Sequence, residues 1–120
     1  MNPVLFLEYP KCSTCKKAKK WLDENGIQYT DRHIVEDNPT AEELAQWHAK
    51  SDLPIRRLFN TSGMLYREQN IKAKLDEGMS NEDAYALLAT NGMLVKRPLI
   101  IGDDFVLVGF KEPEWEANLK

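Results

Sequence analysis

Cysteine and histidine are scarce in this 120-residue chain, which contains two of each. A structural zinc site needs four protein ligands. Such a site would require Cys12, Cys15, His33 and His48 together, and the two histidines fall in different predicted elements. We therefore expect no metal site, and we interpret His33 and His48 as ordinary strand and helix residues.

Long apolar segments and an excess of positive charge are also lacking. The apolar run within residues 1–7 is followed at once by Glu8, Pro10 and Lys11, so it is too short and badly flanked for a signal peptide or a membrane span. A formal net charge of −3 disfavours binding to a nucleic-acid backbone or an anionic membrane. We expect a cytoplasmic protein with neither as its direct partner.

The composition that is present is ordinary for a globular protein. Hydrophobic residues make up 42% of the chain and charged residues 29%, which is unlike a disordered chain. The length suffices for one hydrophobic core and is short for two. We predict a single domain over residues 1–120.

The beginning of the chain predicts a strand, a helix and a second strand. Residues 4–7 form a continuous apolar run, as in a strand covered on both faces. A helix after Cys12 should end at the Asn25-Gly26 pair, and residues 27–35 read as extended. The helical crossover of such a unit makes its two strands parallel.

The middle of the chain predicts a helical insertion over about residues 40–92. Thr40 with Glu43, and Ser80 with Asp83, have the spacing of helix N-terminal caps. The second of these helices should end at Asn91-Gly92. Between them, we interpret residues 52–78 as helical with a turn at 60–63.

The end of the chain predicts a β-hairpin and a last helix. Residues 99–101 and 105–108 are apolar and flank Gly102-Asp103-Asp104, which suits a tight turn. Pro113 suits the first turn of a helix. The whole order is an α/β chain with a mixed sheet, βαβ then ββα, as in a thioredoxin-like fold with a helical insertion before the third strand.

The pair Cys12-Ser13-Thr14-Cys15 is the main candidate for chemistry. It precedes a predicted helix, whose unpaired N–H groups and dipole favour an anion, and the thiolate is the reactive form of cysteine. We predict Cys12 as nucleophile and Cys15 as resolving thiol, with Lys11, Lys16 and Arg97 lowering the pKa of Cys12. The alternative is that both cysteines are simply buried apolar residues.

Four segments of the chain match a known family in order. They are Tyr9 to Ala18, Leu58 to Arg67, Lys96 to Ile100 and Val108 to Phe110. Through them, nearly the whole chain resembles the glutaredoxin-linked arsenate reductases and the Spx-type transcriptional regulators.

The resemblance implies a thiol–disulfide redox protein whose nucleophile is Cys12, with Arg97 beside a cis proline. The substrate would be a small thiol, a disulfide or an oxyanion, and glutathione, glutaredoxin or thioredoxin would be the reducing partner. The alternative function is that of a redox-sensing regulator that binds the RNA polymerase alpha subunit. The remaining candidate substrate-binding residues are Lys11, Ser13, Thr14, Lys16, Asn60 and Pro98.

Arsenate is expected to be at best a poor substrate. The arsenate reductases of this family hold the oxyanion with three arginines, and only Arg97 matches. Asn60 stands near the place of the first and Phe110-Lys111 near that of the third. Lys111 or Arg57 is the alternative cation that could compensate for the missing arginines. Cys15 provides an internal resolving thiol, so we expect disulfide exchange to be the more general activity.

Overall fold

The core of the protein is a four-stranded mixed sheet. The structure, a computed structural model, describes residues 3–120. The strands are β1 (Val4–Glu8), β2 (Tyr29–His33), β3 (Leu99–Ile101) and β4 (Val106–Val108), in the spatial order β2-β1-β3-β4. β1 is parallel to β2, whereas β1 with β3 and β3 with β4 are antiparallel. The predicted mixed sheet and hairpin are confirmed.

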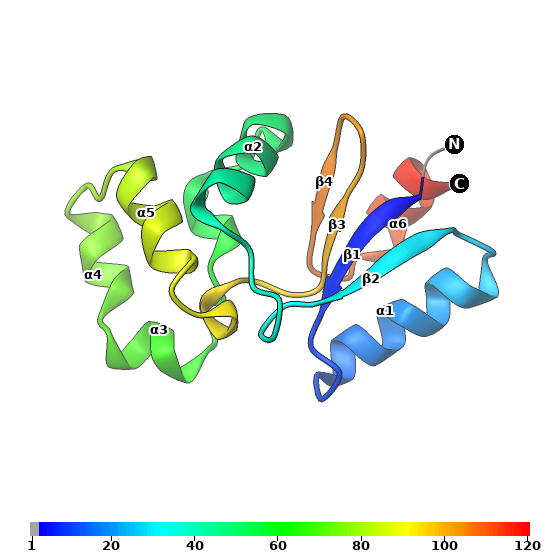
Figure 1. Ribbon diagram of the computed structural model, residues 1–120, viewed down its shortest axis with the longest axis horizontal. Coiled ribbons are helices and arrows are strands. Elements are labelled where there is room, and N and C mark those ends of the chain that lie inside the picture. Colours follow the sequence, from blue (N-terminus) through cyan, green and yellow to red (C-terminus); the bar gives the residue numbers. More distant parts are fainter. Residues whose placement is uncertain (1–2) are drawn as a thin grey trace.

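Two helices, α1 (Ser13–Glu24) and α6 (Glu112–Leu119), cover one face of this sheet (Figure 1). Alternation along β1 sends Phe6 to this face and Leu7 to the other. The Trp115 indole N–H donates to the Gly109 carbonyl oxygen at 3.0 Å. This bond connects α6 to the residue that follows β4. The buried residues of this side are Val4, Phe6, Ala18, Leu22, Ile100, Leu107, Trp115 and Leu119.

The helical insertion lies between β2 and β3 and forms the other side of the molecule (Figure 1). Leu44 and Trp47 belong to the same buried cluster as Leu99 and Val108, so the insertion packs onto the second face of the sheet. Its elements are α2 (Ala41–Ser51), the 3-10 turn η1 (Ile55–Leu58), α3 (Met64–Glu68), α4 (Ile71–Asp76), α5 (Asn81–Leu88) and the 3-10 turn η2 (Gly92–Leu94).

Some element boundaries differ from those predicted. β2 begins at Tyr29 because the N–H of Ile27 donates to Leu22 O at 3.0 Å, as part of the end of α1. α5 ends at Leu88, and Asn91 instead caps η2 by accepting from the N–H of Met93 at 2.9 Å. The turn at 60–63 is confirmed by the Gly63 N–H, which donates to Asn60 O at 3.0 Å.

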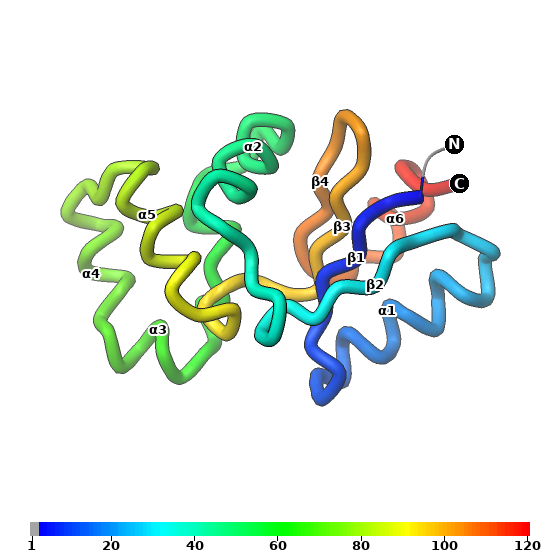
Figure 2. Tube along the Cα trace, viewed as in Figure 1, coloured from blue at the N-terminus to red at the C-terminus, as the bar shows by residue number. Residues whose placement is uncertain are grey.

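The two connections between sheet and insertion pass close to one another, after β2 and before β3 (Figure 2). A Cβ atom added to Gly92 would lie 1.8 Å from the carbonyl oxygen of Ile34. Only glycine fits at that separation, which lets the returning chain lie directly against the outgoing one. No helix among residues 3–120 is long and apolar enough to cross a membrane.

Candidate functional site

Cys12 is the N-terminal cap of α1. Its backbone is extended, with φ −84° and ψ 123°, and its Sγ accepts a hydrogen bond from the N–H of Cys15 at 3.4 Å. The turn is closed by the Cys12 N–H, which donates to Tyr9 O at 2.9 Å. A helix start is where free N–H groups stabilise a negative charge, so this position favours the thiolate form of Cys12.

The pKa of the Cys12 thiol is lowered from its ordinary value. Burial acts in the opposite direction and raises it. The N–H and then the thiol of Cys15 donate to the Cys12 sulfur and outweigh burial, and the charge of Arg97 and the N–H of Thr14 add to their effect. Lys11 and Lys16, which we predicted to share this role, lie exposed beside the turn. The helix start, the Cys15 thiol and Arg97 therefore account for the lowered pKa of Cys12.

Cys15 lies in the third position of α1 and is fully buried. Burial raises the pKa of its thiol to about 12, and the neighbouring sulfur of Cys12 raises it further, although the backbone N–H of Tyr9 acts to lower it. At neutral pH this group remains a protonated thiol and can donate to Cys12. The two cysteines therefore differ in protonation, as a nucleophile and a resolving thiol must.

Arg97 approaches the cysteines from the loop before β3. Its guanidinium carbon lies 5.3 Å from the centroid of the Tyr9 ring, which holds the side chain over the end of β1. The Arg97–Pro98 peptide bond is cis, as the resemblance implied. The Nε and Nη1 atoms of Arg97 are buried and have no hydrogen-bond partner among residues 3–120. They are donors available to a bound anion.

The structure brings some of the other candidate residues to this site and leaves the rest at its edge. Thr14 lines a depression with Arg97, and Asn60 lines a second one with the same arginine. Pro98 is buried, and its carbonyl oxygen accepts from the Gly109 N–H at 2.9 Å, so it supports the site without facing it. Ser13 is exposed at the first position of α1.

A basic depression of about 370 Å³ reaches Thr14 in the first turn of α1. Sequence reasoning named its cations Arg57 and Lys111, but not Lys96. The depression is lined by Arg57 from the insertion, Lys96 from the loop before β3 and Lys111 from the start of α6, together with Arg97. None of these four side chains forms an ion pair within the described part of the chain. Their positive charges therefore remain available to a bound anion.

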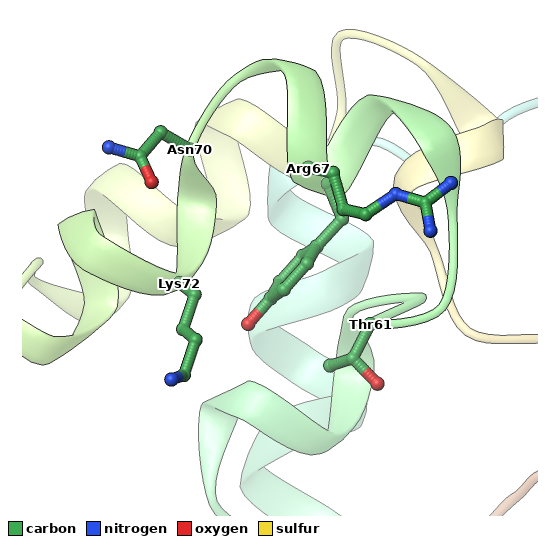
Figure 3. A pocket seen from close by; sticks show the side chains of 5 residues that line it. Thr61, Arg67, Asn70 and Lys72 are labelled. Atoms are coloured by element: carbon green, nitrogen blue, oxygen red, sulfur yellow. The ribbon is translucent and has the colours of Figure 1, made fainter.

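A separate depression of about 330 Å³ lies on the insertion, between α3 and α4 (Figure 3). Its labelled side chains, Thr61, Arg67, Asn70 and Lys72, point in different directions instead of toward one centre. Neither cysteine lines it. We therefore place the candidate site at Cys12 and not here.

A cysteine pair at the start of the first helix, on a mixed sheet of this order, defines a dithiol protein of the thioredoxin-like fold. The sequence matches the ArsC family over residues 7–118, and the chain belongs to that family.

Two relatives in the sequence comparison span nearly all of the chain. The uncharacterized protein YusI of Bacillus subtilis is 51% identical over 115 residues, which are 96% of this chain and 97% of that protein. The global transcriptional regulator Spx of Staphylococcus epidermidis is 30% identical over 111 residues, 92% of this chain and 82% of that protein.

Solved structures agree with the family assignment. An ArsC family related protein from Bacteroides fragilis is 59% identical, with a TM-score of 0.92 and coverage of 97% of both chains. A possible arsenate reductase from Streptococcus mutans is 37% identical, with a TM-score of 0.85, 94% of this chain and 97% of that chain being covered. The family thus includes relatives described as reductases and as regulators.

Proposed function

We propose that this protein is a thiol–disulfide oxidoreductase in which Cys12 is the nucleophile and Cys15 the resolving thiol. The observation that carries the proposal is the contrast between the two sulfurs. Cys12 caps α1 and its pKa is lowered, whereas burial raises the pKa of Cys15 to about 12. The reading that both cysteines are only buried apolar residues does not explain why Cys12 is half-exposed at a helix start.

In the first step, the Cys12 thiolate attacks one sulfur of a substrate disulfide. A Cys12–substrate disulfide forms, the substrate S–S bond breaks, and the other half of the substrate leaves as a thiolate that takes a proton. The N–H of Cys15 and the Arg97 guanidinium lie where they can stabilise the negative charge on sulfur before the attack.

In the second step, Cys15 displaces the substrate from Cys12. The Cys12 sulfur raises the pKa of Cys15 while it is a thiolate. This influence ends when Cys12 is bound in a mixed disulfide, so Cys15 loses its proton more readily at the point where it must attack. The second substrate thiol is released with that proton, and the two electrons come from the protein dithiol, which is oxidised to the Cys12–Cys15 disulfide. Glutathione, glutaredoxin or thioredoxin would then reduce the protein.

Arsenate is proposed to be a poor substrate beside a disulfide. The basic depression includes Lys111 and Arg57, the two cations that could compensate for the missing arginines, and also Lys96. Of its cations, however, Arg57 and Lys111 are exposed and hydrated, and exposed ion pairs contribute little. Within residues 3–120, Arg97 is the one side chain of the depression whose buried nitrogens have no hydrogen-bond partner.

The test compares initial rates for arsenate, with glutathione and glutaredoxin present, with those for a glutathione mixed disulfide and the reduced protein alone. We expect disulfide exchange to exceed arsenate turnover, the Cys12→Ser variant to lose both, and the Cys15→Ser variant to accumulate the Cys12 mixed disulfide. Oxidised wild type should lose the mass of two hydrogen atoms. Efficient arsenate turnover that needs Cys12, alongside negligible disulfide exchange, would overturn the proposal.

A second candidate is a redox-sensing transcriptional regulator, favoured by the 30% identity to Spx over 111 residues. In that case the Cys12–Cys15 pair would act as a switch, and the partner would be the RNA polymerase alpha subunit. Binding of the purified alpha subunit to the reduced and the oxidised chain distinguishes the two functions. Redox-dependent binding without turnover of any disulfide would favour the regulator.

A further inference from the structure

Arg97 separates two depressions of opposite character. On one side is the basic depression of Arg57, Lys96 and Lys111 described above. On the other is an apolar slot of about 290 Å³ that also reaches Arg97. The slot is lined by Asn60, Gly63, Met64, Leu65, Met93 and Arg97. Both depressions therefore meet at the side chain that lowers the pKa of Cys12.

The apolar slot carries the most exposed large hydrophobic side chain among residues 3–120. Met64, at the start of α3, is 66% exposed, although such a side chain gains free energy when it is covered. Met93 reaches the same slot from η2. Methionine side chains are flexible and polarizable, so a methionine-lined surface accommodates apolar groups of different shapes. The slot is suited to an apolar side chain of varied identity.

The basic depression is suited to an acidic group. The chain as a whole carries a net charge of −3, yet this depression gathers four cations that have no ion-pair partner in the described residues. Two Arg97 nitrogens are in addition buried without a hydrogen-bond partner. A carboxylate in the depression would accept hydrogen bonds and neutralise charge.

We propose that the substrate disulfide belongs to a polypeptide whose reacting cysteine has an apolar neighbour in the Met64–Met93 slot and an acidic neighbour in the basic depression. This proposal rests on the disulfide exchange proposed above and names its substrate class. A small anionic thiol such as glutathione supplies carboxylates for the basic depression but no apolar side chain for the slot. A polypeptide supplies both, on either side of its cysteine.

The experiment measures single turnovers, in which the reduced protein is the only source of electrons. The substrates are peptides whose one cysteine is disulfide-bonded to 2-mercaptoethanol. In each turnover the protein dithiol becomes the Cys12–Cys15 disulfide, and the peptide thiol and 2-mercaptoethanol are released with the two protons. The peptides carry leucine on one side of cysteine and glutamate on the other, in both orders, with leucine-to-serine and glutamate-to-glutamine versions of each.

In one of the two orders, wild type should react about tenfold faster with the leucine peptide than with its serine version. The glutamate version should exceed the glutamine version by about fivefold at low salt and by less at high salt. Met64→Ala should reduce the leucine-to-serine ratio to about two, and Lys111→Ala should reduce only the glutamate-to-glutamine ratio. The matched control is Lys72→Ala, which removes a lysine from the depression between α3 and α4 (Figure 3) and should keep both ratios.

Failure of this inference differs from failure of the proposed function. If wild type reacts with bis(2-hydroxyethyl) disulfide and with all peptides at one rate, the polypeptide assignment is wrong while the exchange activity stands. A leucine-to-serine ratio that survives Met64→Ala would likewise refute the slot. If neither the peptides nor the small disulfide oxidise the Cys12–Cys15 pair, both proposals are wrong.

Discussion

Replacing Glu43 with glutamine tests how the insertion is held against the sheet. Arg32, in β2, donates from Nη1 to Oε2 of Glu43 at 2.7 Å and from Nη2 to Oε1 at 2.9 Å, and Glu43 lies in the first turn of α2. Arg32 is only 13% exposed and also lies over the Trp47 ring. The pair therefore connects the sheet, whose strand β1 leads to Cys12, with the insertion that carries part of the site.

The expected loss follows from the pKa of Glu43. The hydrogen bonds from Arg32 lower it from 4.5 to about 2, against an opposing effect of burial. A change of that size corresponds to about 3 kcal/mol. Because the Glu43 side chain is 34% exposed, water screens the pair, and we expect a loss of about 1–2 kcal/mol in the free energy of unfolding. Glutamine can still accept the Thr40 N–H bond of the helix cap, so the substitution removes mainly the charge.

The sign of the pH dependence follows from the lowered pKa. A carboxyl group whose pKa falls on folding stabilises the protein above its unfolded pKa of 4.5, and that contribution is lost as the pH falls from 4.5 toward about 2. Urea unfolding of wild type and Glu43→Gln, followed by circular dichroism from neutral pH to about pH 3, should show the difference shrinking. Glu42→Gln, an exposed neighbour in the same turn, is the control. A loss that is undiminished at low pH, or matched by Glu42→Gln, would refute the argument.

Three further outcomes are expected. Arg97→Ala should raise the pH at which the rate of Cys12 alkylation by iodoacetamide is half-maximal, because the positive charge of Arg97 favours the thiolate. Arg97→Lys should raise this pH less, and an unchanged pH profile in Arg97→Ala would refute the role of Arg97. Cys15→Ala should also raise the midpoint pH of Cys12 alkylation, since the thiol that donates to Cys12 is lost. Cys15→Ser keeps a donor, so its midpoint pH should lie close to that of wild type in the same assay. Gly92→Ala should cost about 1–3 kcal/mol in urea unfolding, because its Cβ would overlap the Ile34 carbonyl oxygen. A loss no larger than that of the exposed substitution Glu42→Gln would show that this overlap does not occur.

The order of elements and the reactive pair could be read from the sequence because both are local signals. Apolar runs, the Thr40 cap and the Gly102-Asp103-Asp104 turn act over a few neighbouring residues, and each is confirmed in the structure. The spacing of Cys12 and Cys15 before a helix likewise placed the first sulfur at a helix start. Element ends were less predictable, since α5 stops at Leu88 before the glycine signal.

The surroundings of Cys12 were decided by the tertiary structure. Lys11 and Lys16 are its neighbours in sequence, yet they lie exposed, whereas Arg97 acts on it from the loop before β3. The basic depression joins Arg57 from the insertion with Lys111 from the start of α6. No local pattern marks such side chains as partners. They meet because β3 pairs with β1 and the insertion packs on the sheet, and this packing determines which charges act on the thiolate.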